Sequence, residues 1–413
     1  MNGAMLREGA RRKQGMSMTV QAALSPTATP SIILEKQKET KTAAVQDDQK
    51  EIKIRVLLMD SDHTTYEHEV VSGRYDGKEF FYTAESQEMQ GGELILRPED
   101  GNITITSIER QCKEPVYQGE LTIRKKGQKL YLINELPLEE YLRAVVPSEM
   151  PSAYEKQALM AQAICARTYA WKQILDGGIL EYGADVDDSV SYQVYGNILP
   201  QDSTDEAVEE TKGLIMMKEN EPIEAYYFST SAGMTSTDEV WGAQEAASYL
   251  KRVVCDFDEE SPWRSWSVTI PWESLQRKVA ALSGREQELL SVEAVRKNES
   301  GAVTRIQAVT KTDVFYIDRE YEVREFLSPE GCMITEKDGT QTQGGKLLPS
   351  AYFTLRQTQG ERLEITGGGY GHGVGMSQTA ANEMAKEGYS YQEILDYFFN
   401  EVTTGLIPSD VDG

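Results

Sequence analysis

The pattern of apolar residues changes near Leu136, and this change limits the possible folds more than any other feature of the chain. Short strand-like runs precede it, separated by Gly and Asp-Gly turns, at residues 52–59, 93–96, 103–108, 121–123 and 130–133. After it, apolar residues recur at helical spacing from about 152 to 175, where Gly177-Gly178 ends the stretch. Segregated strands and helices predict an α+β fold, with a mixed, sheet-rich core and a few helices that form a groove.

The same patterns divide the chain into parts. Residues 1–48 are rich in Gln, Lys, Thr, Ala and Pro, which predicts a flexible tether. Residues 49–135 are predicted to form a β-rich region, and residues 136–405 a larger domain with a strand-rich subdomain at about 256–360. Within it, residues 223–228 predict a buried strand. Ser390 and Glu393 predict a capping box on the last helix.

Charge and composition exclude several classes of protein. The chain has 42 basic and 67 acidic residues, a net charge of −25, which disfavours nucleic acid as a partner because phosphate contacts need clustered Lys and Arg. No apolar run approaches the roughly 20 residues that span a bilayer, and the N-terminus resembles a signal peptide only weakly, so membrane anchoring is left open. The four cysteines show no CxxC spacing, and we expect most of them to be reduced or buried.

Glu149 is the most unusual carboxylate of the chain, because it lies between Pro147 and Pro151. Prolines restrict their own backbone and that of the preceding residue, which predicts a constrained loop. Ser152 and Glu155 predict a capping box on the following helix, whose positive end would lower the Glu149 pKa. An acid catalyst would then need an apolar pocket to raise that pKa again. The alternative, a Glu that only stabilises the helix N-terminus, is about equally consistent with these residues.

Arg167 falls between Ile164 and Trp171, on an otherwise apolar face of the helix predicted after Ser152. It either extends to the surface along its aliphatic stem or pairs with a group inside the protein. We expect it to turn toward the groove and to affect activity more than stability.

The most distinctive local pattern is the glycine-rich stretch 367–375, in which His372 has a glycine on either side. Glycines at this density predict a tight turn or a close approach of the backbone. The stretch lacks the Gly-Lys-Ser/Thr ending of a P-loop and fits the GxGxxG spacing poorly, which disfavours nucleotide binding. His372 contacts a ligand in one interpretation and is a structural imidazole in the other.

Metal and nucleophile chemistry have weaker support. With three histidines and no paired cysteines, a zinc site would need several carboxylates, and we expect neither a metal nor another cofactor. No GxSxG motif is present, and Cys165 lies within a predicted helix, as a small core residue would. Ser229 or Ser231 paired with His372 remains an alternative nucleophile and base.

Several separate motifs, in the same order, resemble the stage II sporulation protein D family. The resemblance runs from about 116 to 399 and rests on residues 136–142, 146–151, 158–171, 227–233, 240–242 and 371–378. Catalytic members of that family are lytic transglycosylases, which cleave the β-1,4 bond between N-acetylmuramic acid and N-acetylglucosamine and leave 1,6-anhydro ends. In sporulation they act beside an amidase that removes the stem peptides.

The resemblance implies that Glu149 is the general acid and base. It also implies a substrate-binding role for residues in motifs of the family's groove: Gln193, Tyr195, Ser229, Ser231, His372 and Gln378. The expected partners are peptidoglycan glycan strands and a cell-wall amidase, and the expected location is extracytoplasmic. Some members hold zinc through a Cys and a His where this chain has Val186 and Ser191, so no metal is expected there.

Two other functions compete with the transglycosylase. A non-catalytic glycan-binding or amidase-enhancing protein would need the same groove, but Glu149 between its prolines favours the enzyme. A Ser/His hydrolase would depend on Ser229 rather than on Glu149.

Overall fold

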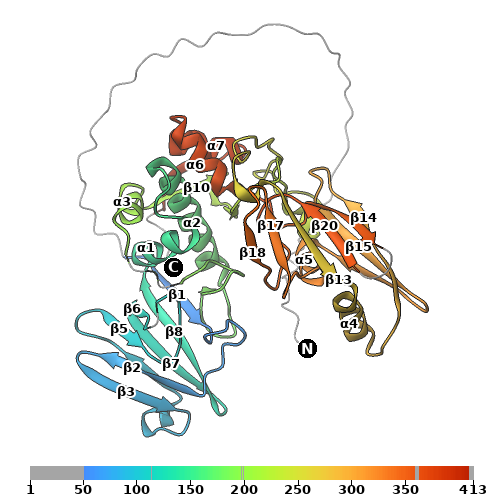
Figure 1. Ribbon diagram of the computed structural model, residues 1–413. Coiled ribbons are helices and arrows are strands. Elements are labelled where there is room, and N and C mark those ends of the chain that lie inside the picture. The colour runs from blue at the N-terminus through green and yellow to red at the C-terminus, as the bar shows by residue number, and fades with distance from the viewer. Residues whose placement is uncertain (1–50, 113, 197, 199, 359–361, 409–413) are drawn as a thin grey trace, which may run out of the picture. The chain divides into compact units, whose positions relative to one another are not determined.

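The computed structural model of the protein describes residues 51–112, 114–196, 198, 200–358 and 362–408 (Figure 1). The predicted tether, residues 1–48, lies outside the described residues. The rest of the chain forms both helices and sheets. The predicted α+β class is therefore confirmed.

Two antiparallel sheets form from the strand-like runs that precede Leu136. One sheet has the order β4-β7-β8-β1-β9, with bounds Glu93–Leu96, Glu120–Lys126, Lys129–Pro137, Lys53–Leu58 and Val186–Asp187. Only β9 joins it in parallel, beside β1. The other sheet has the order β3-β2-β5-β6, with bounds Lys78–Thr83, Val70–Tyr75, Asn102–Ile105 and Val116–Gln118.

The core beneath these sheets continues into the helices that follow them. Strand β8 leads directly into α1 (Leu138–Glu149), and α2 (Lys156–Asp176) comes next. One buried cluster contains Ile123 of β7, Val145 of α1 and Trp171 of α2. The hydrophobic core therefore extends across the predicted boundary at residue 135.

Helix α2 is buried on most of its surface, because chain segments distant in the sequence cover it. They include α3 (Asp202–Glu210), α6 (Gln378–Lys386), α7 (Tyr391–Phe398) and the small sheet of β11, β10 and β22 (Glu221–Pro222, Leu214–Lys218, Thr403–Leu406). Figure 1 shows the red C-terminal helices beside the green α2. The predicted capping box of Ser390 and Glu393 is present at the start of α7.

Strands and two helices make up the region between residues 266 and 367. One sheet has the order β18-β17-β13-β20-β19, with bounds Gln341–Gln343, Met333–Glu336, Trp266–Pro271, Arg362–Gly367 and Phe353–Thr358. The other consists of β14, β15 and β16 (Leu289–Lys297, Val303–Thr310, Val314–Asp318). With α4 (Trp272–Ser283) and α5 (Glu320–Phe326) they enclose a separate hydrophobic cluster.

Three local predictions were wrong. Pro147 is inside α1 rather than in a loop, because the packing of α1 on α2 and α3 outweighs the cost of a proline in its last turn. Ser152 does not cap α2, whose N-cap is Glu155 without a side-chain bond. The predicted strand 223–228 is reduced to β12 (Tyr227–Phe228), which pairs in parallel with β21 (Met376–Ser377).

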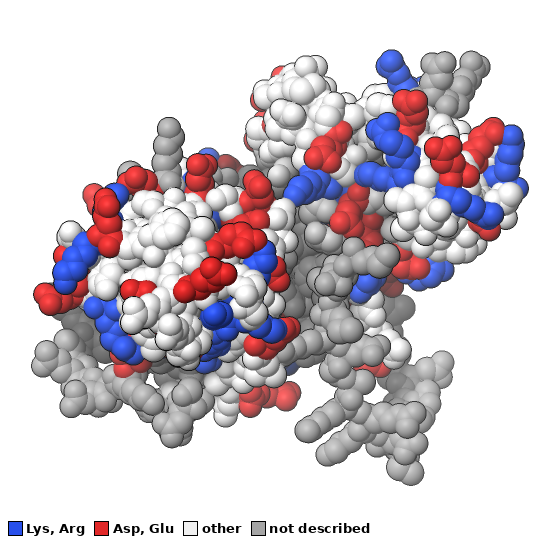
Figure 2. All heavy atoms as spheres, turned by 90° about the horizontal axis from the view of Figure 1, so that it is seen from below, with Lys and Arg blue, Asp and Glu red and all other residues white. Residues whose placement is uncertain are grey.

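Within the described part of the chain, no helix is long and apolar enough to cross a membrane. On the face seen in Figure 2, acidic and basic side chains of the described residues are interspersed, without a continuous basic surface.

Candidate functional site

Glu149 is the last residue of α1, and the chain becomes extended at Met150. The carboxylate therefore lies at the negative end of a helix dipole, where its charged form is disfavoured. The sequence-based expectation had the opposite sign, because it placed Glu149 before a helix rather than at the end of one.

The Glu149 side chain is part-buried and held by groups from two other segments. Its Oε1 accepts a bond from the Val194 main-chain N–H at 2.6 Å, and the Tyr227 hydroxyl of β12 also bonds to it. Gln378, the first residue of α6, donates from Nε2 to the Glu149 main-chain oxygen at 3.1 Å. These contacts come from residues up to 229 positions away, so only the folded chain assembles them.

Burial raises the pKa of Glu149 to about 7, although the bonds from Val194 and Tyr227 oppose this by stabilising the carboxylate. No second carboxylate of the described residues is among the causes. Near neutral pH the group is therefore divided between its acid and base forms, as a residue that both donates and accepts a proton requires.

Gln193 organises the polar groups beside Glu149. It is buried, its Oε1 accepts from the Tyr141 hydroxyl at 3.2 Å, and its Nε2 donates to the Tyr227 hydroxyl at 3.1 Å. Because the Tyr227 oxygen accepts that bond, its own proton can be donated to Glu149. Gln193 thus fixes a hydroxyl at the carboxylate rather than offering its own amide to a ligand.

Gln378 is also held in place. Its Nε2 donates to Gln162 Oε1 at 3.3 Å as well as to Glu149, and the side chain is 6% exposed. The structure therefore brings Gln193 and Gln378 to Glu149, and it does so mainly through contacts within the protein.

Tyr195 lies in the core instead. Its hydroxyl donates to Asn134 at 3.1 Å, its ring packs on Tyr117 and Tyr141, and the residue is 2% exposed. These contacts disfavour the predicted substrate contact, because core aromatic residues cover the ring.

Arg167 also faces the interior rather than a groove. It is fully buried, pairs with Glu139 of α1 at 2.7 Å and donates to the main-chain oxygens of Val208 and Leu214. These contacts disfavour the predicted orientation toward the groove and the predicted role in substrate binding, because they occupy the guanidinium with groups of α1, α3 and β10.

His372 is enclosed by the rings of Tyr226, Phe228 and Trp241. Its Nδ1 accepts a bond from the Val374 N–H at 3.1 Å, and the Tyr227 main chain also bonds to the ring. Burial lowers the His372 pKa to about 3, so the imidazole is neutral at physiological pH. These contacts favour the structural interpretation of His372.

The glycines around His372 have the predicted role. Gly373 and Gly375 have φ values of +82° and +80°, and a Cβ would lie 2.4 Å from the Tyr352 hydroxyl oxygen and 2.0 Å from the Tyr226 main-chain oxygen, respectively. Both the left-handed backbone and the close approach therefore require glycine at these positions.

The serines do not form a dyad with His372 in the described structure. Ser231 is 2% exposed, and its main-chain N–H donates to the buried Asp258. Ser229 Oγ lies 3.3 Å from Thr230 Oγ1. Since the His372 ring bonds to the main chain of Val374 and Tyr227 and no bond joins it to either serine, the hydrolase alternative is weakened.

Sequence reasoning missed Tyr141, Tyr227 and the Val194 N–H. Both tyrosines stand inside motifs that supported the resemblance, which was the signal available in the sequence. A main-chain donor carries no such signal, because every residue except proline has one.

The two positions considered for zinc lie in different surroundings. Val186 is buried in β9, and Ser191 is exposed. Among the described residues, no group of three or more His, Cys, Asp or Glu side chains is arranged to hold a metal ion.

Two family models and several known proteins match the sequence of this chain. Residues 126–217 match the family model "Stage II sporulation protein", and residues 234–375 match a domain of unknown function, DUF8618. Stage II sporulation protein D of Bacillus subtilis is 33% identical over 281 residues, which are 65% of this chain and 74% of the relative. An uncharacterised protein of Brachyspira hyodysenteriae is 30% identical over 311 residues, 75% of each chain.

The amidase enhancer of Bacillus subtilis is 28% identical over 294 residues, which are 63% of this chain and 40% of that protein. The segments that match the two family models include α1 and the turn that holds Val194, in residues 126–217, and the glycine-rich stretch around His372, in residues 234–375. The extent of the match to stage II sporulation protein D places this chain in the stage II sporulation protein D family.

Proposed function

We propose that the protein is a peptidoglycan lytic transglycosylase that uses Glu149 as its general acid and base. The observation that carries the proposal is a single part-buried carboxyl group with a pKa of about 7, held by the Val194 N–H and the Tyr227 hydroxyl.

The chemistry needs only one such residue. Protonated Glu149 gives its proton to the glycosidic oxygen as that bond breaks, and the carboxylate then takes the proton of the muramic acid 6-hydroxyl. The 6-hydroxyl oxygen closes on C1 and leaves a 1,6-anhydro end, so no water and no second carboxylate take part. Ordinary glycosidases differ here, since they place two carboxyl groups across the scissile bond.

The deciding experiment is digestion of peptide-free glycan strands followed by mass spectrometry of the products. The unmodified protein should yield 1,6-anhydro ends. Glu149→Gln keeps the size of the side chain but cannot donate a carboxyl proton, so cleavage should fall roughly 10²- to 10⁴-fold while glycan binding persists. Hydrolysed, reducing ends would contradict the mechanism, and so would normal cleavage by the variant.

Glu224 offers a matched control. It is also a part-buried glutamate whose pKa burial raises, but the partners of its carboxyl group are Gln173 and Tyr226. Glu224→Gln should therefore leave cleavage in place, and equal losses in both variants would assign the effect to structure rather than to proton transfer.

A second candidate is a non-catalytic glycan-binding protein that enhances an amidase, favoured by the similarity to a protein named amidase enhancer. On this proposal, Glu149→Gln would stimulate a cell-wall amidase as well as the unmodified protein does. In both cases the expected partners are peptidoglycan strands and a cell-wall amidase, and the expected location is outside the cytoplasm.

A further inference from the structure

The turn that carries Val194 runs from Asp188 to Gly196. Its internal bonds are two main-chain bonds, from Tyr192 to Ser189 at 3.1 Å and from Tyr195 to Asp188 at 3.4 Å, and one bond from the Ser191 N–H to Ser189 Oγ at 3.1 Å. No described helix or strand lies within it. The side chains of Gln193 and Tyr195 anchor the middle of the turn, and the path of the main chain past Glu149 also depends on how the two ends are held.

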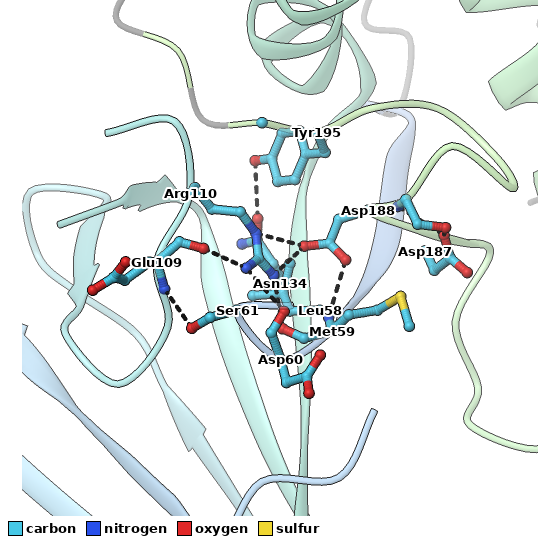
Figure 3. Close-up of polar contacts among 12 residues, drawn as sticks. Leu58, Met59, Asp60, Ser61, Glu109, Arg110, Asn134, Asp187, Asp188 and Tyr195 are labelled. Atoms are coloured by element: carbon cyan, nitrogen blue, oxygen red, sulfur yellow. Dashed lines mark hydrogen bonds and ion pairs between the residues drawn. The ribbon is translucent and has the colours of Figure 1, made fainter. Parts of the chain in front are cut away.

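The first end is held by a buried ion pair (Figure 3). Arg110 Nε donates to Asp188 Oδ2 at 2.9 Å, while Asp188 Oδ1 accepts from the Met59 N–H at 3.0 Å. Both side chains are almost fully buried, at 1% and 0% exposed. The guanidinium also donates to the main-chain oxygens of Met59, Asp60 and Glu109, so all of its nitrogens have partners.

The second end is held by the residue next to Arg110. The Gln111 N–H donates to the Gly196 oxygen at 3.2 Å, and the Gly196 N–H donates to Ser148 Oγ at 3.2 Å. Ser148 directly precedes Glu149 in α1. Two consecutive residues of one loop, Arg110 and Gln111, thus fasten both ends of a nine-residue turn whose middle reaches the carboxylate.

We propose that Arg110 is a positioning residue for Glu149: together with Gln111 it clamps the 188–196 turn and so holds the Val194 N–H against the carboxylate. The loop belongs to the β-rich region before residue 126, where the match to the sporulation family model begins. The β-rich region therefore contributes to the site through Arg110 and Gln111, which hold the 188–196 turn. The consequence for cleavage rests on the proposed function, but the effect on Glu149 does not.

The Val194 bond stabilises the charged carboxylate, so a looser turn should raise the Glu149 pKa further. The titratable groups that face Glu149 are the hydroxyls of Tyr141, Tyr169 and Tyr227, and burial raises all three pKa values well above their usual range. They remain neutral between pH 5 and 9 and do not obscure the titration of Glu149.

The test follows the stability gained by Glu149→Gln as a function of pH, because this readout needs no cleavage. A carboxyl whose pKa is raised by folding contributes stability below its unfolded pKa and loses it as pH rises through its folded pKa. The gain from Glu149→Gln should therefore grow with pH and level off just above pH 7. In an Arg110→Lys background, which keeps the charge but not the planar fork, it should level off roughly one pH unit higher.

Arg324→Lys is the matched control, since Arg324 also pairs with a buried acid, Glu320, and with main-chain oxygens, but contacts no part of the turn. It should lower stability without moving the pH at which the gain from Glu149→Gln levels off, which we call the bend of the pH curve. If Arg110→Lys does not fold, Ser148→Ala, which removes the acceptor at the other end of the turn, should move the bend in the same direction.

An unmoved bend in the folded variant overturns the inference, as does an equal movement with Arg324→Lys. If cleavage is absent but the bend moves, the proposed function fails and the positioning role stands. If cleavage is present but the bend does not move, the positioning role fails alone.

Discussion

At the scale of single residues, Glu149 differs from the other described carboxyl groups in that it ends a helix and meets one main-chain N–H and one tyrosine hydroxyl. Burial and the helix terminus both favour its protonated form, and two hydrogen bonds moderate the effect. The balance leaves a group that can act as an acid and then as a base near neutral pH.

The pH dependence of cleavage should report this group. Because protonated Glu149 is needed first and its pKa is about 7, kcat/KM should be steady below that pH and fall about tenfold per pH unit above it. The profile can be measured with peptide-free strands between pH 5 and 9. Constant activity up to pH 9 would contradict the assignment.

Arg167 should matter for stability. Arg167→Met leaves Glu139 without its partner and removes bonds to two main-chain oxygens, so the free energy of unfolding should fall by about 3–5 kcal/mol. Urea denaturation checks this, and adding Glu139→Gln should restore part of the loss. If the single variant is stable but binds glycan poorly, Arg167 acts in the groove and the structural role is contradicted.

At the scale of elements, local sequence determines the conformation of the glycine-rich turn, whereas packing also determines where the helices start. The turn places a neutral imidazole among three aromatic rings, where it joins residues 226–228 to 372–374.

His372 should not titrate in the physiological range, because burial lowers its pKa to about 3. With three histidines in the chain, the His372 resonances can be assigned by comparison with His372→Asn and followed by NMR from pH 5 to 8. Constant chemical shifts are expected, and a transition near pH 6.5 would show a solvated, reactive ring.

The two predicted capping boxes should behave differently. Ser390 accepts a bond from the Glu393 N–H and completes its box, so Ser390→Ala should cost about 1 kcal/mol of unfolding free energy. Ser152 lies outside its helix, with a long 3.4 Å contact to Gln201, so Ser152→Ala should cost less than about 0.5 kcal/mol. Equal effects in thermal or urea unfolding would contradict the helix start seen in the structure.

At the scale of the whole molecule, the site depends on segments from both ends of the described chain. Arg110 lies near its start and Gln378 near its end, and α1, with Glu149, lies between them in the sequence. Removing the β-rich region would therefore remove contacts that hold the site, in addition to shortening the protein.

Removal of metal ions should have no effect on the molecule as a whole. The predicted absence of a zinc pair at Val186 and Ser191 leads us to expect that exhaustive chelation changes neither the melting temperature nor cleavage. Loss of cleavage on chelation, restored by zinc, would overturn this prediction.

Local patterns and ordered motifs were enough to predict the fold class, the long α2, the cap of α7 and the family. They also singled out Glu149, but placed it in a loop rather than at the end of α1.

The remaining features depend on contacts between distant parts of the folded chain. The tertiary structure extended α1 through Pro147, because packing against α2 and α3 outweighs a local propensity. It turned Arg167 and Tyr195 into the core and brought Val194, Tyr227 and the Arg110 clamp to Glu149. These contacts join residues dozens to hundreds of positions apart, and some use main-chain groups that every residue has, so no local pattern could specify them.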